Sequence, residues 1–314
     1  MVEKRQLGRW RVSRLCFGSL ALGPLQNRLP LSEGAALLRE GLEMGINFID
    51  TADLYGTYPY IREALKGYAG EVIIASKSYA VTAEEMAQTV ERARRELDRD
   101  RIEIWLLHEQ ESAHTLRGHR GAIDYLLEAK ERGIIGSIGL STHHIAGVRA
   151  GAVHEDMEII MPLINKTGIG IVDGTAEEMC QAMELAQQMG KGLFGMKPLG
   201  GGHLRTRAEE ALQFCLGLDS LASIAVGMKS RAELLMNIKL FQGEPIENDL
   251  RASVQATPRA LHVESWCLGC GACVEACSAQ ALSIVDDRCR VDSSRCILCG
   301  YCGAACPDFA LKII

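Results

Sequence analysis

Nine of the chain's 12 cysteines lie within its last fifty residues, and eight of these form two runs that share one internal spacing. Within each run, successive cysteines are separated by two, two and three residues. The runs are Cys267, Cys270, Cys273 and Cys277, then Cys296, Cys299, Cys302 and Cys306. They are offset by 29 residues (296 minus 267), and the repeat continues as Ala281-Leu282 and Ala310-Leu311. This pattern predicts a duplicated half-module that carries two sets of four thiolates.

The cysteine pattern resembles that of bacterial-type ferredoxins, in which the fourth cysteine of each run ligates the other of two 4Fe–4S clusters. The resemblance implies one cluster on Cys267, Cys270, Cys273 and Cys306, and a second on Cys296, Cys299, Cys302 and Cys277. Structural zinc is the alternative, because paired C-x2-C motifs also bind zinc. A zinc site does not require a third cysteine at the same spacing and a fourth after three further residues, and here both recur in each run. Two 4Fe–4S clusters are therefore expected. Cys289 lies outside both runs and is expected in a strand.

The chain length of 314 residues is about that of two domains. We expect a large domain at 1–241, a linker at 242–262 and the ferredoxin domain at 263–314. The hydrophobic fraction of 47% is that of a globular protein. A net charge of −6 argues against nucleic acid or an anionic membrane as partner, and no long apolar span appears. Thiolate clusters without a secretory signal lead us to expect a cytoplasmic location.

Eight short β-branched runs alternate with amphipathic stretches in the first 240 residues. The expected strands are 15–17, 46–50, 72–76, 102–107, 134–140, 157–164, 192–196 and 222–226. The expected helices are 33–44, 60–68, 83–97, 120–131, 145–151, 175–190, 206–217 and 230–240. Because no G-x-G-x-x-G follows the first strand, the pattern favours a closed barrel over an open dinucleotide-binding sheet. The predicted fold class is α/β, a (β/α)8 TIM barrel with a small C-terminal α+β domain. Residues 4–13 are expected to form a hairpin at the bottom of the barrel.

Polar residues at the carboxyl ends of barrel strands are candidates for catalysis. Asp50, Lys77 and His108 close the second, third and fourth strands, and Tyr55 follows in the loop after Asp50. A buried lysine needs a carboxylate partner, so Asp50 is expected to pair with Lys77. An ammonium near a phenol lowers the phenol's pKa, so Tyr55 is expected to donate a proton, with His108 beside the substrate oxygen. Three rival tyrosines are Tyr58, Tyr60 and Tyr79.

The surrounding segments closely resemble those of aldo-keto reductases. They are Asn-Phe-Ile-Asp-Thr-Ala-Asp-Leu-Tyr-Gly at 47–56, Ile-Ala-Ser-Lys at 74–77 and Trp-Leu-Leu-His at 105–108. The resemblance covers about residues 4–241 and implies hydride transfer between NADP and a carbonyl, with Asp50, Tyr55, Lys77 and His108 as the tetrad. With the extra C-terminal domain, the chain is similar to predicted oxidoreductases that join this barrel to a ferredoxin module. The implied partners are a small carbonyl or alcohol substrate and an electron-transfer protein.

The same resemblance implies a set of contacts to the nicotinamide nucleotide. They are Gly18 and Ser19 after the first strand, Ser141 and Thr142 at the carboxamide, Asn165, the loop of Lys197, Pro198, Leu199 and Gly200, and Gly227, Lys229, Ser230 and Asn237 at the adenine and 2'-phosphate end. Three residues depart from the family pattern. Thr142 replaces an asparagine, Met196 a stacking tyrosine and Glu233 an arginine. Since a carboxylate repels phosphate, the choice between NADP and NAD stays open.

Iron–sulfur clusters transfer single electrons whereas nicotinamide transfers a hydride, and the chain has no clear flavin motif to mediate between them. The leading hypothesis is an iron–sulfur aldo-keto reductase that uses NAD(P). One alternative is a reductase that takes electrons through its clusters without nicotinamide, which the three departures favour and Lys229 with Ser230 oppose. Another is a non-catalytic redox-sensing protein. Because the C-terminal module replaces the loop that covers the family's substrate pocket, a cluster over the barrel mouth is a further possibility.

Overall fold

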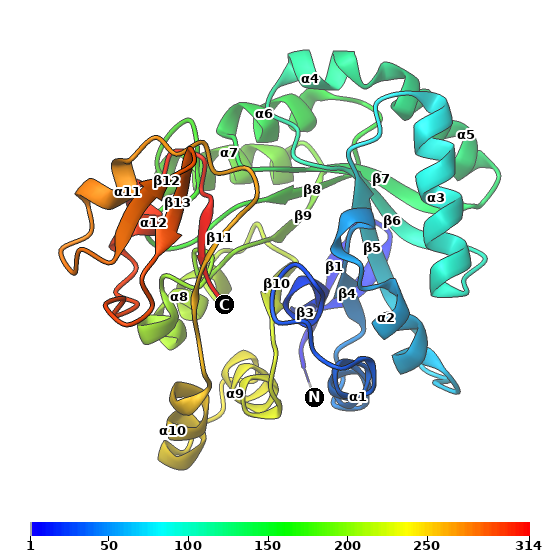
Figure 1. The fold of residues 1–314 in the computed structure, drawn as a ribbon. Helices are drawn as coiled ribbons and strands as arrows, with labels where there is room; N and C mark the ends of the chain where they lie inside the picture. The colour runs from blue at the N-terminus through cyan, green and yellow to red at the C-terminus, as the bar shows by residue number, and fades with distance from the viewer. Residues whose placement is uncertain (1) are drawn as a thin grey trace.

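The computed structural model describes residues 2–314 and contains a closed barrel of eight parallel strands inside a ring of helices (Figure 1). The strands follow chain order around the barrel, and β10 closes it by pairing with β3. They are β3 (Leu15–Gly18), β4 (Phe48–Asp50), β5 (Ile73–Ser78), β6 (Ile102–Leu107), β7 (Ile135–Thr142), β8 (Ile159–Pro162), β9 (Gly192–Gly195) and β10 (Ser223–Gly227). Each overlaps a run predicted from the sequence, and the predicted fold class is confirmed.

The barrel helices also match the predicted stretches to within a few residues. They are α1 (Leu31–Glu43), α2 (Tyr58–Leu65), α3 (Ala83–Leu97), α5 (Arg120–Glu131), α6 (Ile145–Val153), α7 (Ala176–Gln188), α8 (Ala208–Leu216) and α9 (Arg231–Phe241). Thr82 and Thr175 begin α3 and α7 with capping boxes, in which the threonine hydroxyl and a glutamate satisfy backbone N–H groups reciprocally. The sequence pattern does not predict the short helix α4 (Ala113–Gly118), which is too short to show a periodicity. Among the described residues, no helix has the length and apolarity needed to span a bilayer.

The barrel interior forms an inner core, separate from the outer core between the strands and the helices. Phe48 and Phe194 meet edge-to-face in the inner core with ring centroids 4.9 Å apart. The predicted hairpin is present as β1 (Lys4–Leu7) and β2 (Trp10–Ser13). Leu7 and Trp10 of the hairpin belong to the inner core and close the end where the strands begin. The opposite end, where the strands finish, is the end at which barrels of this kind carry their active sites.

The C-terminal domain is a duplicated structure, as the 29-residue repeat predicts. Its elements are β11 (Leu261–Val263), α11 (Ala272–Glu275), β12 (Leu282–Val285), β13 (Arg288–Val291), α12 (Tyr301–Ala305) and β14 (Leu311–Ile313). β11 pairs with β14, and β12 pairs with β13, both antiparallel. Equivalent backbone N–H groups contact equivalent thiols: Ala281 N lies 3.3 Å from Cys277 Sγ, and Ala310 N lies 3.2 Å from Cys306 Sγ. Cys289 lies in β13, in agreement with its expected place in a strand.

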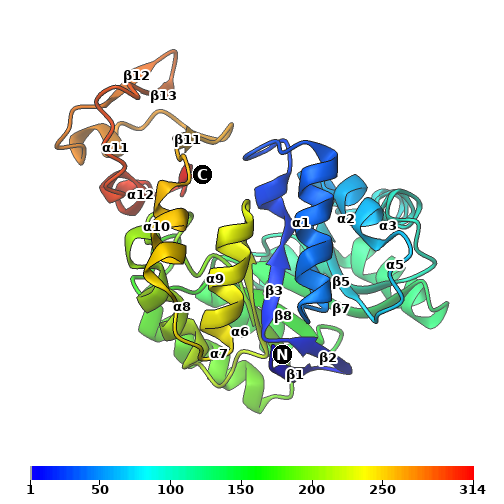
Figure 2. The same cartoon turned by 90° about the horizontal axis from the view of Figure 1, so that it is seen from below.

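The segment 242–262, expected as a linker, contains defined secondary structure. Helix α10 (Asn248–Ala256) packs beside α9, and Arg251 pairs with Glu209 of α8 (Figures 1 and 2). Residues 257–260 then lead from α10 to β11. Leu261 and His262 already pair with β14, so the sheet of the C-terminal domain begins before residue 263.

The C-terminal domain docks on the barrel loop that follows β9, at the end of the molecule opposite the β1–β2 hairpin (Figure 2). The backbone N–H of Ile313 donates to the carbonyl of Gly201 at 2.8 Å. His203 Nε2 donates to the Leu311 carbonyl, also at 2.8 Å. Phe309 is 3% exposed and belongs to the inner core of the barrel. One side chain of the C-terminal domain is therefore built into the barrel mouth.

Gly202 of this loop provides a test of the docking. It has φ +88°, and a Cβ built there would lie 2.0 Å from the Ile313 carbonyl oxygen. Gly190 is a matched control, because it has φ +82° with nothing within 4 Å of its Cβ position. We predict that Gly190→Ala lowers the free energy of unfolding by about 1–2 kcal/mol, the cost of the left-handed conformation. Gly202→Ala should cost at least twice as much and speed proteolysis within 257–260, because β14 must move. Equal losses for the two variants would contradict the docking.

Candidate active site

The four predicted tetrad residues come together at the carboxyl ends of β4, β5 and β6. Lys77 is 1% exposed, and its Nζ donates to Asp50 Oδ1 at 2.6 Å and to the Thr51 carbonyl at 2.8 Å. The predicted Asp50–Lys77 pair is therefore confirmed. The Lys77 ammonium lies 5.0 Å from the centroid of the Tyr55 ring, and the Tyr55 and His108 centroids are 6.1 Å apart in an edge-on arrangement.

The buried ion pair fixes the centre of this group. Burial raises the pKa of Asp50, and the Lys77 charge and hydrogen bond oppose that rise. Removing one partner from such a pair leaves an uncompensated buried charge, which typically costs about 3–5 kcal/mol. The ammonium is therefore held in one position beneath the Tyr55 ring.

The expected lowering of the Tyr55 pKa is wrong. Burial, followed by the negative charges of Asp50 and Glu109, raises the pKa of Tyr55 well above its ordinary value. Lys77 does not reverse this effect, because its charge is shared with Asp50. A phenol with a raised pKa stays protonated, so Tyr55 holds a proton that a substrate oxygen can accept.

His108 is kept neutral in an apolar position. Burial, followed by the charges of Lys77 and Lys197, lowers the pKa of His108 well below its ordinary value. Within residues 2–314, the buried His108 Nδ1 atom has no hydrogen-bond partner. The Tyr79 ring stacks on the imidazole at 4.3 Å, and the Tyr79 hydroxyl donates to Glu109 Oε2 at 2.6 Å. Tyr79 therefore covers His108, a role that the sequence does not reveal.

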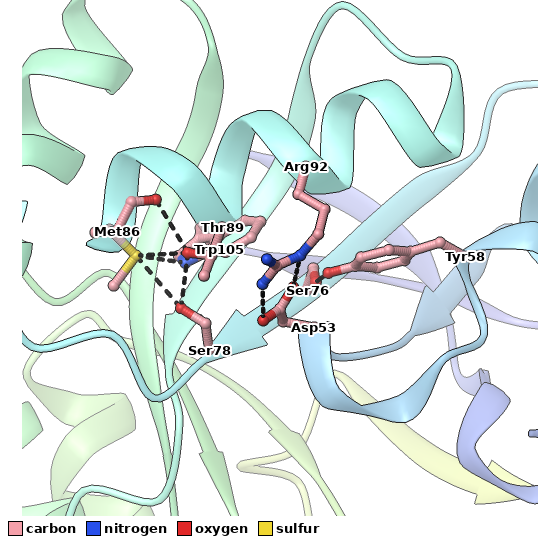
Figure 3. A network of polar contacts seen from close by, with 8 residues as sticks. All are labelled: Asp53, Tyr58, Ser76, Ser78, Met86, Thr89, Arg92 and Trp105. Atoms are coloured by element: carbon pink, nitrogen blue, oxygen red, sulfur yellow. Dashed lines mark hydrogen bonds and ion pairs between the residues drawn. The ribbon is translucent and has the colours of Figure 1, made fainter. Parts of the chain in front are cut away.

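A network of polar contacts that includes Asp53, Arg92, Tyr58 and Ser76 holds the segment around Tyr55 in place (Figure 3). The 3-10 turn that carries Tyr55 also carries Asp53, whose carboxylate accepts both Nε and Nη2 of Arg92 on α3. This bidentate contact anchors the turn to the helix layer. The Tyr58 hydroxyl is 2.7 Å from Ser76 Oγ, and Tyr60 donates to a backbone carbonyl in another loop. Both of these phenols are thus occupied away from the tetrad.

The eight cysteines line two pockets in the C-terminal domain. One pocket is lined by Cys267, Cys270, Cys273 and Cys306, and the other by Cys277, Cys296, Cys299 and Cys302. Each pocket thus contains three cysteines of one run and the fourth cysteine of the other. Within residues 2–314, no three His, Cys, Asp or Glu side chains are close enough to hold one metal ion. Four thiols around a shared space fit a four-iron cluster better than a single zinc ion.

Comparison with known proteins identifies both parts of the chain. The model of the aldo/keto reductase family matches residues 14–220, which is more than half of the chain. The chain belongs to the aldo/keto reductase family. The 4Fe-4S dicluster domain matches residues 266–310 of this aldo/keto reductase. Both matches confirm the resemblances seen in the sequence, and membership of this family makes the protein an oxidoreductase.

Individual relatives of this aldo/keto reductase are distant. L-galactose dehydrogenase of Arabidopsis thaliana is 23% identical over 282 residues, covering 76% of this chain and 87% of that protein. Pyridoxine 4-dehydrogenase of Escherichia coli is 42% identical over 77 residues, which are 23% of this chain and 27% of that protein. The holo form of aldo-keto reductase AKR11C1 from Bacillus halodurans has a TM-score of 0.65 at 24% identity, covering 81% and 96% of the two chains. That structural likeness supports the barrel fold.

The residues expected at the nicotinamide end of this aldo/keto reductase contact the protein itself. Ser19 Oγ is 2.9 Å from a threonine hydroxyl, and Ser141 Oγ accepts the Glu109 N–H at 2.9 Å. Thr142 Oγ1 accepts a backbone N–H in its own loop at 2.9 Å. Asn165 holds the loop that follows it, donating to a carbonyl at 2.8 Å and accepting two backbone N–H groups. Gly18 and Gly227 lie side by side at the ends of β3 and β10, where a Cβ on Gly18 would lie 3.2 Å from the β10 backbone, so glycine allows these strand ends to pack closely.

The phosphate end is covered by the segment that leads to the C-terminal domain. Lys229 Nζ donates to the Pro258 carbonyl at 2.8 Å, and Arg259 forms an ion pair with Glu233. Ser230 begins α9 by accepting the Glu233 N–H at 3.2 Å, and Asn237 on the same helix is 8% exposed. The residues present therefore fit a nucleotide only if residues 258–259 move away.

One loop expected to contact the nucleotide also contacts the C-terminal domain. It consists of Lys197, Pro198, Leu199 and Gly200 and leads directly into the hydrogen bond between Gly201 and Ile313. Lys197 Nζ lies 2.8 Å from His143 Nε2 and 5.0 Å from the centroid of the Phe309 ring. Sequence reasoning missed Phe309 and Lys312 at this rim, because they follow the barrel by many residues. The one available signal was that the C-terminal module replaces the loop over the substrate pocket.

Proposed function

We propose that this protein interconverts a small carbonyl compound and its alcohol at the tetrad, with electrons exchanged through two 4Fe–4S clusters. The observation that carries the proposal is the position of Phe309. This residue follows the cysteine Cys306 by three positions and is buried in the inner core of the barrel. One cysteine set is thus tied directly to the mouth in which Tyr55 and His108 lie.

The proposed cluster ligands are the two sets of four cysteines that line the two pockets. A bound cluster supplies one-electron transfer, and its reduction potential depends on the hydrogen bonds to its sulfur atoms. The backbone N–H groups of Ala281 and Ala310 are placed to make such bonds to Cys277 and Cys306. Cys289 lines neither pocket, so we assign it no ligand role.

In the direction of reduction, Tyr55 donates the proton that the carbonyl oxygen takes up. Because its pKa is raised, the phenol stays protonated over the physiological pH range. The Lys77 ammonium, held by Asp50, lies 5.0 Å from the centroid of the Tyr55 ring and partly offsets the negative charge that forms on the phenol oxygen, although it does not outweigh burial. The neutral His108 forms the opposite side of the site. Reduction of a carbonyl consumes two electrons and two protons. An external one-electron donor would supply both electrons through the clusters, Tyr55 provides the proton that goes to oxygen, and solvent provides the proton that goes to carbon.

A second candidate function retains the family's NADP as the hydride donor. The match of residues 14–220 to the family and the presence of Lys229 and Ser230 after β10 favour it. The contacts of Pro258 with Lys229 and of Arg259 with Glu233 favour the nicotinamide-free alternative, because they occupy the groups that would read the 2'-phosphate. We therefore rank electron entry through the clusters first. Family membership favours either enzyme over a redox-sensing protein without activity.

The cluster assignment predicts about eight iron and eight sulfide per chain in anaerobically purified protein, four of each for every cluster. Cys306→Ser and Cys277→Ser should each impair a different cluster, because each removes one ligand from a different set. Cys289→Ser is the matched control and should keep the full iron and sulfide content. Stoichiometric zinc without acid-labile sulfide would refute the assignment.

Nucleotide titration separates the two candidate functions. Neither NADPH nor NADH is expected to bind the wild-type holoprotein at concentrations up to about 1 mM, a typical upper limit of enzyme KM values. If nicotinamide is used, NADPH should bind, and Lys229→Ala should weaken NADPH but not NADH by about 10- to 100-fold, the value of a charge-assisted contact. Lys239→Ala, within the helix α9 that follows Lys229, is the control. Tight NADPH binding with that selective loss would move the second candidate to first place.

The role of Tyr55 is tested by Tyr55→Phe with a chemically reduced low-potential dye as the electron donor. The variant should keep its iron content and lose about 10²- to 10⁴-fold in turnover, the usual scale of general acid catalysis. Tyr60→Phe is the control, since its hydroxyl contacts only a distant loop. Because the Tyr55 pKa lies above its ordinary value of 10.0, the wild-type rate should not fall through loss of this proton below about pH 10. Full turnover in Tyr55→Phe would remove the tetrad as the working site.

A further inference from the structure

Two lysines meet where the barrel mouth joins the C-terminal domain. Lys197 follows β9, and Lys312 lies on β14 with 5% of its surface exposed. They flank one aromatic ring: the Phe309 centroid is 5.0 Å from Lys197 Nζ and 2.9 Å from Lys312 Nζ. Their hydrogen-bond partners are neutral, a ring nitrogen of His143 for Lys197 and the Phe309 carbonyl for Lys312. Within residues 2–314, neither ammonium has a carboxylate at ion-pair distance.

This arrangement is costly for the protein alone. A buried ammonium without a carboxylate loses several kcal/mol of hydration that neutral partners do not replace. Burial lowers the pKa of Lys197 to about 8 and the pKa of Lys312 well below its ordinary value, and the charge of Lys197 lowers the pKa of Lys312 further. Glu109 and Glu264 raise the pKa of Lys197 from beyond ion-pair distance, and Glu109 already accepts a hydrogen bond from Tyr79. The cation–π contacts with Phe309 offset a part of the cost of burial.

The backbone at Lys197 adds an independent sign of function. Its φ is +57°, in the left-handed region that residues with a Cβ rarely adopt. Strain of this kind is concentrated at binding and catalytic sites, where the surrounding structure holds it in place. The left-handed conformation of Lys197 lies in the loop on which the C-terminal domain docks. The side chain of the same residue lies beside His143 at the barrel mouth.

The lysine pair is close to the tetrad. A chain of contacts joins Lys197 to His108. Lys197 Nζ lies 2.8 Å from His143 Nε2, which lies 3.5 Å from Glu109 Oε1. The Tyr79 hydroxyl donates to Glu109, and the Tyr79 ring stacks on His108. Glu264, next to β11 in the C-terminal domain, acts on both Tyr55 and Lys312. A small molecule with its carbonyl oxygen at Tyr55 can therefore extend toward the two ammonium groups.

We propose that Lys197 and Lys312 form a carboxylate subsite, and that the substrate is a small oxo acid or the corresponding hydroxy acid. The two carboxylate oxygens each accept a charge-assisted hydrogen bond, one from the barrel and one from the C-terminal domain. The carbonyl carbon then lies between this subsite and Tyr55. This inference rests on the proposed function, since it assigns the substrate class of the same site. Phosphate is the other anion with suitable oxygens, and the experiment separates the two.

The test is a calorimetric titration of the anaerobic holoprotein with pyruvate and 4-oxobutanoate, which place the carboxylate at two distances from the carbonyl. Their neutral partners are pyruvamide and butanal, and glyceraldehyde 3-phosphate is the phosphate probe. At least one oxo acid should bind at least 10-fold more tightly than its neutral partner and than the phosphate probe. Lys197→Met should weaken that oxo acid by about 10- to 100-fold, the value of a charge-assisted contact. Lys197→Arg should restore most of the binding.

Two further variants serve as controls for the Lys197→Met result. Lys66→Met removes an exposed lysine that pairs with Glu63 far from the mouth, and it should leave binding unchanged. Lys312→Met, with iron content and thermal unfolding measured alongside, should reproduce the loss in Lys197→Met. If no oxo acid binds better than its neutral partner, if the phosphate probe binds best, or if Lys197→Met has no selective effect, the subsite is refuted. Binding that depends on Lys197 in a protein whose turnover survives Tyr55→Phe would keep the subsite and refute the proposed function instead.

Discussion

The seating of Phe309 in the barrel mouth is the contact on which the functional features depend. It places Lys312 opposite Lys197, and it holds β14 against the loop after β9 through the Ile313–Gly201 hydrogen bond. The segment leading to this domain also binds Lys229 and Glu233, which stand where the family reads a nucleotide phosphate. The docking of one domain thus brings a second lysine to the rim of the barrel and occupies Lys229 and Glu233, two residues near the expected nucleotide phosphate.

The tetrad itself is little affected by this change, because its geometry is fixed from within. Asp50 and Lys77 are buried and paired, and Arg92 anchors the turn that carries Tyr55 through Asp53. The four tetrad residues therefore keep one arrangement whatever lies above them. Burial keeps the pKa of Tyr55 high and the pKa of His108 low.

Local patterns were enough to predict the barrel, the tetrad and the cysteine sets. Lys77 at the end of an apolar strand calls for a carboxylate, and Asp50 stands on the neighbouring strand, so their pairing follows from sequence position. The expected nucleotide contacts could not be assessed in this way. Lys229 carries the same sequence signal whether it faces a phosphate or the Pro258 carbonyl, because its partner is set by tertiary docking. The Tyr55 pKa was mispredicted for a related reason, since burial outweighs a nearby charge that is already paired.

The 29-residue repeat gives the C-terminal domain two similar halves, but the halves differ where they meet the barrel. Phe309 corresponds to Gln280 (309 minus 29), and both residues adopt φ +48°. Gln280 is exposed, whereas Phe309 is buried in the mouth. Lys312 likewise corresponds to the exposed Ser283 (312 minus 29). The two halves of one repeat thus have different surroundings: Phe309 and Lys312 pack against the barrel mouth, while Gln280 and Ser283 face solvent. Divergence at two equivalent positions is enough to decide which half of a symmetric domain can dock on another domain.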